Sequence, residues 1–155
     1  MRLDQTDVSL ISLLRENARM TNKELAERTG ISPSTCLERV RRLVENGVLT
    51  GFHATVDSQA VGIGVQAMIA VRHSQHQPLS FERMRDELLQ IREVVAVYLL
   101  AGTRDYLVHV ATRDVDNLRN VCEQFSSRSE VAHIETSLIL DFARSDSPPM
   151  YLDDA

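Results

Sequence analysis

Apolar side chains recur at helical spacing from the start of the chain, where Leu10, Ile11 and Leu14 open the pattern. This spacing places the three side chains on one face of a helix. Asp4 and Asp7 precede them, and carboxylates at the start of a helix cap its free amides and oppose its dipole. The pattern therefore predicts a first helix that begins after Asp4.

Two further helices follow, with only a tight turn between them. Residues 21–24, Thr-Asn-Lys-Glu, form a capping box, and Gly30 ends the second helix as a C-cap. Ser32 is an N-cap followed by a proline at the first helical position, and the third helix then runs to Asn46. Two helices joined by so short a glycine-containing turn predict a helix-turn-helix.

The third helix has an apolar side and a polar side. Cys36, Val40, Leu43 and Val44 form a stripe that we expect to be buried. The opposite side carries hydroxyls near the N-terminus, then a carboxylate and guanidinium groups, which are the groups that a recognition helix presents to DNA. The predicted DNA-binding residues are Ser32, Ser34, Thr35, Glu38, Arg39, Arg41 and Arg42, with Arg41 at a guanine and Arg42 at a phosphate. For the arginines alone, the alternative is an ordinary solvated helix face.

Two short strands are predicted after the third helix, over residues 48–51 and 52–56. A hairpin at this place would be a wing, so residues 1–56 are predicted to form a winged helix-turn-helix domain. Residues 57–64 contain two glycines and are predicted to be a hinge linker.

The pattern changes from residue 65 onward. Strand-like apolar runs at 65–71, 94–100, 106–111 and about 131–142 alternate with two segments of helical periodicity. The helical positions are Phe81, Met84, Leu88 and Ile91 in the first segment, and Val115, Leu118, Cys122 and Phe125 in the second. This order predicts a ferredoxin-like βαββαβ domain over residues 65–142, in which both helices lie on one face of an antiparallel sheet. The fold class is therefore α+β.

The uncovered face of that sheet is the candidate interface between subunits. A strand as apolar as residues 94–100 is poorly suited to water on one side, so we expect this face to meet a second copy of the chain. Residues 143–155 contain two prolines and three aspartates and are predicted to be a mobile or peripheral tail.

Charge is unevenly distributed along the chain. The net charge of −5 argues against a nucleic-acid partner when the chain is taken as a whole. However, residues 1–50 carry 8 basic and 7 acidic side chains, while residues 51–155 carry 9 and 15. A local basic face can steer toward phosphate whatever the overall charge, so DNA binding by the first domain is compatible with this composition.

Several other classes of protein are not indicated. Cys36 and Cys122 form no CxxC pair, so we expect neither a disulfide framework nor a zinc site. No apolar run reaches the length of a membrane span and the N-terminus is polar, which predicts a soluble cytoplasmic protein. We predict no metal or other cofactor, because the five histidines do not cluster with other ligands: His53, His73, His76, His109 and His133. No catalytic triad order, phosphate loop or carboxylate pair is present, so we expect no enzyme activity.

The motifs of the first domain resemble the DNA-binding domain of the Lrp/AsnC regulators (leucine-responsive/asparagine-responsive, or feast/famine). They comprise Asp4-x-x-Asp7-x-x-Leu10-Ile11, Glu24-Leu25-Ala26, the run from Gly30 to Cys36, and Arg39-Val40-Arg41-Arg42-Leu43. Residues 47–52 and 56–57 are similar to the wing and hinge of that family, and residues 101–107 to its effector-domain turn. The resemblance covers about residues 2–142.

This resemblance implies a sequence-specific DNA-binding transcriptional regulator whose RAM-type C-terminal domain oligomerises and senses a small effector, usually an amino acid. It implies a homodimer that assembles further to a tetramer or octamer. Twofold symmetry then implies an imperfect palindromic operator in double-stranded DNA. The rival interpretation is an amino-acid-binding regulatory module of a metabolic enzyme complex, against which the N-terminal winged helix counts.

The resemblance also places the effector beside the turn at residues 102–105, between neighbouring dimers. The predicted effector-binding residues are Gly102, Thr103, Asp105 and Ser137. In this interpretation Asp105 accepts a hydrogen bond from the ligand ammonium group, and the amides of Gly102 and Thr103 hold the ligand's carboxylate. The alternative is that these residues form a plain β-turn. The turn departs from the family pattern. The family more often has two small residues followed by glycine, whereas here Ala101 is followed by Gly102 and then Thr103.

Overall fold

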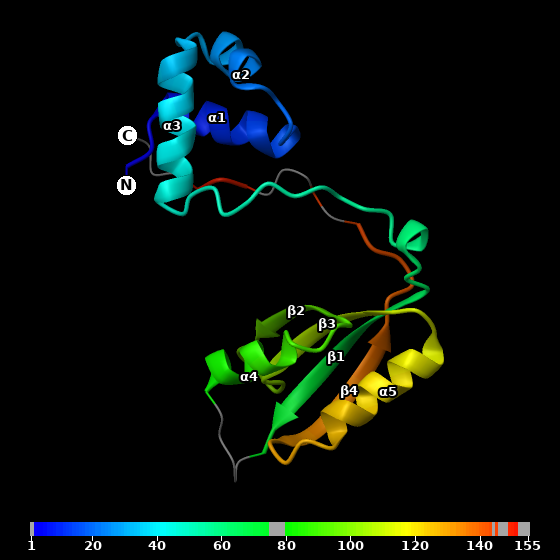
Figure 1. Cartoon of the computed structure of the whole chain (residues 1–155). Helices are drawn as coiled ribbons and strands as arrows, with labels where there is room; N and C mark the ends of the chain where they lie inside the picture. The colour runs from blue at the N-terminus through cyan, green and yellow to red at the C-terminus, as the bar shows by residue number, and fades with distance from the viewer. Residues whose placement is uncertain (1, 75–79, 144, 146–148, 152–155) are drawn as a thin grey trace. The chain divides into compact units, whose positions relative to one another are not determined.

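The computed structural model describes residues 2–74, 80–143, 145 and 149–151 of the chain. The chain divides into two compact units (Figure 1). One comprises Met1–Thr55 together with Ala143–Ala155, and the other comprises Val56–Phe142. Each unit has its own hydrophobic core.

Three helices form the N-terminal unit: α1 (Gln5–Glu16), α2 (Asn22–Thr29) and α3 (Pro33–Glu45). Each begins at its predicted cap, whose side chain accepts a hydrogen bond from the backbone N–H three residues later. The core that they enclose consists of Leu10, Ile11, Leu14, Leu25, Ala26, Cys36 and Leu43. Burying a large aliphatic side chain contributes about 1.5–3 kcal/mol, so this shared core stabilises helices that would be marginal in isolation.

The turn between α2 and α3 confirms the predicted helix-turn-helix. Gly30 adopts the left-handed backbone conformation that favours glycine, with φ of 69°. The N–H of Ile31 donates to the carbonyl of Ala26 at 3.0 Å and closes α2. The side-chain amide of Asn22 donates to the carbonyl of Pro33 at 2.7 Å, so the start of α2 is tied to the start of α3.

The predicted pair of wing strands is wrong. Among the described residues, 48–56 form no strand. The N–H groups of Val48 and Leu49 instead both donate to the carbonyl of Leu43, at 2.9 and 3.1 Å, and so close the end of α3. A two-stranded hairpin is marginal by itself, and Thr50-Gly51 is not one of the dipeptides that favour a tight hairpin turn.

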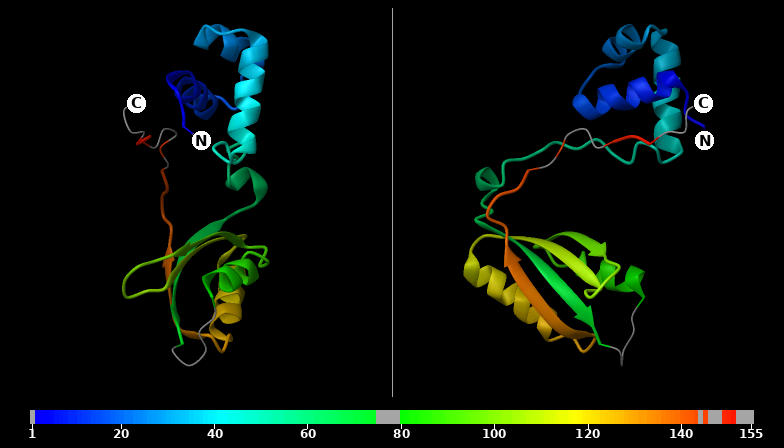
Figure 2. Two further views of the ribbon diagram at one scale, coloured as in Figure 1. Left: turned by 90° about the vertical axis from the view of Figure 1, so that its left-hand side faces the viewer. Right: turned by 180° about the vertical axis from the view of Figure 1, so that it is seen from behind.

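The C-terminal unit is a four-stranded antiparallel sheet with two helices on one face (Figure 2). Its elements are β1 (Val65–His73), α4 (Phe81–Leu88), β2 (Val94–Leu99), β3 (Tyr106–Thr112), α5 (Val115–Ser126) and β4 (Val131–Leu138). The strand order β2-β3-β1-β4 confirms the ferredoxin-like arrangement. Alternate residues of β1 and β3 are buried against the helices, because side chains along a strand alternate between its two faces.

Some positions differ from the helical and strand patterns. Val44 and Val115 are 44% and 64% exposed, although both were expected to be buried, and Val121 is buried in α5 instead. A helical wheel gives the direction of a side chain but not the extent of the element that covers it. In addition, α4 ends at Leu88 and β4 at Leu138, each earlier than predicted.

The segment expected to be a hinge is packed on the C-terminal unit. It contains a single 3₁₀ turn, η1 (Gln59–Val61). The N–H of Gly64 donates to the carbonyl of Thr112 at 3.0 Å. A Cβ at Gly64 would lie 2.4 Å from the carbonyl oxygen of Arg113, so glycine permits this close approach of the two backbones.

Candidate DNA-binding surface and effector turn

The first turn of α3 brings three of the predicted DNA-binding residues together. The Ser32 hydroxyl lies 2.9 Å from that of Ser34 and 2.8 Å from that of Thr35. It also accepts the Thr35 backbone N–H at 3.1 Å. All three side chains are exposed. Because a hydroxyl both donates and accepts, this group can meet base edges or phosphate oxygens.

Arg41 is the most accessible arginine among the predicted DNA-binding residues. Its side chain is 63% exposed and lies between two glutamates of the same helix, 3.1 Å from Glu38 and 3.4 Å from Glu45. Exposed ion pairs of this kind contribute about 0–1 kcal/mol. A guanine or phosphate could therefore replace the glutamates at little cost.

Arg39 and Arg42 are instead engaged by the N-terminal turn of α1. Arg39 Nη1 lies 2.7 Å from Asp4 Oδ2 and 2.9 Å from Asp7 Oδ1. Arg42 Nη2 lies 3.0 Å from Asp7 Oδ2 and 3.2 Å from Asp7 Oδ1. The prediction treated Asp4 and Asp7 only as helix-capping residues. Both pairs have a spacing of three residues on their helices, but the sequence does not show that the two pairs meet.

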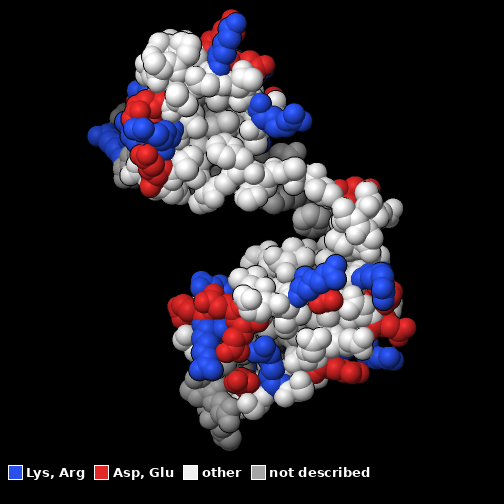
Figure 3. Space-filling model, viewed as in Figure 1, with Lys and Arg blue, Asp and Glu red and all other residues white. Residues whose placement is uncertain are grey.

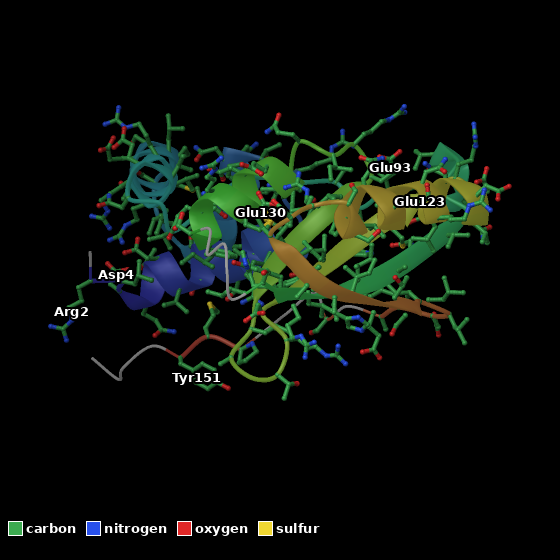
Figure 4. All side chains as sticks on the ribbon, turned by 90° about the horizontal axis from the view of Figure 1, so that it is seen from below. Arg2, Asp4, Glu93, Glu123, Glu130 and Tyr151 are labelled. Atoms are coloured by element: carbon green, nitrogen blue, oxygen red, sulfur yellow. The ribbon has the colours of Figure 1, made fainter. Side chains whose placement is uncertain are left out.

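These carboxylates reduce the positive charge over α3. Figure 3 shows acidic and basic side chains interleaved on the visible face of the N-terminal unit, and Figure 4 labels Asp4 at the start of α1. The hydrogen bond from the Asp7 backbone N–H, followed by that from Arg39, lowers the pKa of Asp4. The two aspartates raise the pKa of Arg39. Both shifts favour the charged forms of Asp4 and Arg39.

Asp105 closes the turn between β2 and β3. Its Oδ2 accepts the backbone N–H of His73 at 2.6 Å. Its own N–H donates to the carbonyl of Val71 at 3.1 Å, and its carbonyl accepts the N–H of Leu100 at 2.8 Å. Gly102 has φ of 147° and is exposed, as is Thr103. The hydrogen bond that fixes the Asp105 carboxylate therefore comes from β1.

Ser137 lies apart from this turn. It is paired with Met68 in β1, whereas Asp105 bonds to the far end of β1, at His73. A separation of five strand positions corresponds to about 17 Å. The structure instead brings Arg104 against Glu135 of β4 in an ion pair. The register between β1 and β4 that makes this contact was not predicted.

The face of the sheet opposite α4 and α5 carries mostly uncharged side chains, with Glu135 beside Ala70 and Arg72 toward one end of β1. By the pairing of the strands, the uncharged side chains include Gln66, Met68, Ala70, Tyr98, Leu107, His109 and Ser137. The imidazole Nε2 of His109 lies 2.9 Å from the side-chain oxygen of Gln66. Burial lowers the pKa of His109 and so favours the neutral ring.

Within residues 2–74, 80–143, 145 and 149–151, no group of three or more histidine, cysteine or acidic side chains could hold a metal ion. His76 lies outside the described residues. Over the same part of the chain, no helix is long and apolar enough to cross a membrane.

Both units match known protein families. Residues 3–50 match the model for the winged helix-turn-helix DNA-binding domain, and residues 66–148 match that for the Lrp/AsnC ligand binding domain. The HTH-type transcriptional regulator AldR of Mycobacterium tuberculosis is 42% identical over 147 residues, which are 94% of this chain and 82% of that protein.

Solved structures agree with the family matches. The feast or famine regulatory protein from M. tuberculosis complexed with L-methionine has a TM-score of 0.86 and 30% identity, and the match covers 95% of this chain and 98% of that one. A transcriptional regulator from Neisseria meningitidis in complex with L-methionine has a TM-score of 0.81 and 29% identity, with 92% and 93% covered. The predicted resemblance is confirmed, and the chain belongs to the Lrp/AsnC family of DNA-binding transcriptional regulators.

Proposed function

We propose that this regulator reads operator DNA with the exposed side of α3. The observation that carries the proposal is the placement of the Ser32, Ser34 and Thr35 hydroxyls and the Arg41 guanidinium on exposed turns of one capped helix. Helix-turn-helix proteins insert the N-terminal part of this helix into the major groove. Arg41 then supplies a bidentate contact to guanine, and the hydroxyls contact neighbouring bases or phosphates.

The effector that we propose is an amino acid, bound beside Gly102, Thr103 and Asp105. Asp105 Oδ2 is held by the N–H of His73, and a carboxylate has further acceptor capacity for a ligand ammonium group. The L-methionine bound by the two structural relatives supports this class of ligand. Ser137 remains a weaker part of the proposal, because its partner Met68 lies five strand positions from His73, which bonds to Asp105.

We further propose that the uncovered face of the sheet joins two copies of the chain. Its uncharged middle, around Met68 and His109, suits an isologous contact. Two copies of α3 would then meet two half-sites, which predicts an imperfect palindromic operator. Contacts between such dimers would give the tetramer or octamer. We propose no catalytic reaction for this chain, because AldR and the Neisseria meningitidis relative are transcriptional regulators.

A thermal-shift screen of the twenty amino acids tests the effector proposal. A ligand at 100 times its Kd stabilises the folded state by about 2.7 kcal/mol. For a unit the size of Val56–Phe142, this corresponds to a rise in Tm of about 10–20 °C. We expect one amino acid, or a few of similar side chain, to produce such a shift. No rise in Tm with any of the twenty, each at 10 mM, would contradict the proposed class of effector.

A further inference from the structure

Asp7 is a buried carboxylate that pairs with two arginines of another helix in addition to capping α1. Its side chain is 1% exposed. It receives Arg39 at 2.9 Å and Arg42 at 3.0 Å, and both arginines come from α3. A buried charge requires a paired and hydrogen-bonded partner. Two guanidinium groups provide more than this requirement, so the second arginine is free to have another role.

The two arginines differ in how much of each remains accessible. Arg39 is 24% exposed, and its Nη1 is shared between Asp4 and Asp7. Arg42 is 45% exposed, and only its Nη2 is hydrogen-bonded to a side chain of the described residues. A guanidinium is planar and carries five N–H donors. Arg42 is therefore held through Nη2, while the donors on Nε and Nη1 stay available among the described residues.

We propose that Asp7 is a positioning residue for DNA binding, which holds Arg42 so that its unbound donors meet a DNA phosphate. Arg39 pairs with both Asp7 and Asp4 and joins α1 to α3 without contacting DNA. Holding a long side chain in place before binding removes part of the entropy that would otherwise be lost on the DNA. This inference rests on the proposed placement of α3 in the major groove.

We expect Asp7→Asn to change operator affinity in the direction opposite to that which net charge alone would give. Removing a negative charge from a DNA-binding unit should strengthen its attraction to phosphate. Asp7→Asn removes one negative charge, yet we expect it to weaken operator binding by about 2- to 12-fold for each protomer on the DNA. The reason is that Arg42 is no longer held in place before DNA binds. Glu16→Gln is the matched control, because it removes the same charge from the exposed last turn of α1. It should leave the affinity unchanged or raise it.

The experiment is a salt titration of operator affinity with the full-length protein. Arg42→Gln should reduce the slope of log K against log salt by about 0.9 for each protomer, because one phosphate contact is lost. Asp7→Asn should keep the wild-type slope and lower only the affinity. In the Arg42→Gln background, Asp7→Asn should cause no further loss. Asp7→Asn binding as tightly as wild type, or an equal loss with and without Arg42, would overturn the proposal.

Two further variants keep the result interpretable. If Asp7→Asn melts below the assay temperature, Arg42→Lys replaces it, since lysine keeps the charge but lacks the planar fork that fixes one nitrogen on Asp7 and directs the others away from it. It should lose the same 2- to 12-fold with an unchanged slope, and wild-type affinity would overturn the proposal. If Arg41→Ala and Arg42→Gln both leave binding unchanged, the placement of α3 itself is wrong, and this inference is overturned with it.

Discussion

Met68→Asp is expected to convert the protein to monomers and to lower operator affinity by about 100-fold or more. Met68 lies in the middle strand pair of the uncovered sheet face, between His109 and Ser137. In an isologous interface each new carboxylate would be buried near the same carboxylate of the other protomer. The substitution would then combine the cost of desolvation with the repulsion of like charges. The loss of simultaneous binding to two half-sites then removes an avidity of about 10²–10⁴.

Light scattering and a gel-shift titration at fixed salt measure the two effects of Met68→Asp. Met68 lies outside the hydrophobic core of the C-terminal unit, so the fold should survive, as circular dichroism would verify. Gln124→Asp is the matched control, because it places the same charge on the exposed side of α5. A Met68→Asp dimer at tens of micromolar would show that the subunits meet elsewhere.

Arg41→Ala is expected to weaken binding to the operator by about 1–3 kcal/mol and to relax specificity at one base pair, since a bidentate contact to guanine is lost. The fold should be unaffected, because the Arg41 side chain is 63% exposed and its ion pairs within the described part of the chain are with Glu38 and Glu45 of its own helix. Gel-shift titration against the operator and against single-base variants measures both effects.

Arg119→Ala is a control with matched surroundings. Arg119 is 68% exposed and pairs with Asp116 and Glu123 at the same helical spacings, but on α5 of the other unit. Its loss should leave DNA binding at the wild-type value. Equal affinities for the Arg41→Ala and Arg119→Ala variants would remove Arg41 from the DNA interface.

Local signals predicted most of the fold. Asp4, Thr21 and Ser32 begin the three helices as expected, because a cap depends only on the residues within one turn of it. The wing strands at 48–56 failed because a strand depends on a partner that the local pattern does not specify. The exposure of Val44 has a similar cause, since helical periodicity does not specify which side of α3 another element covers.

The candidate site was less predictable than the fold. The exposure of Ser34, Thr35 and Arg41 followed from helical periodicity, which is a local property. The contact of Asp7 with Arg39 and Arg42 joins residues more than thirty positions apart, and no local pattern indicates it. The hydrogen bond from His73 to Asp105 likewise depends on the register of β1 against β3.

We expect an amino acid bound at the turn of residues 102–105 to change the affinity of the protein for DNA. Asp105→Asn is the sharpest variant for testing this claim, because the asparagine oxygen can still accept the His73 N–H while the negative charge for the ligand ammonium group is removed. Asp105→Ala removes both, and comparison of the two variants separates the effect of the turn from that of the charge.

Operator affinity of the wild type and of Asp105→Asn, measured with and without each of the twenty amino acids, tests the claim most directly. We expect one amino acid to change wild-type affinity by about 5- to 150-fold. In Asp105→Asn the response should be lost or blunted, while affinity without ligand stays within about tenfold of wild type, or ~1.4 kcal/mol. A wild-type affinity that no amino acid alters, or an undiminished response in Asp105→Asn, would contradict the account.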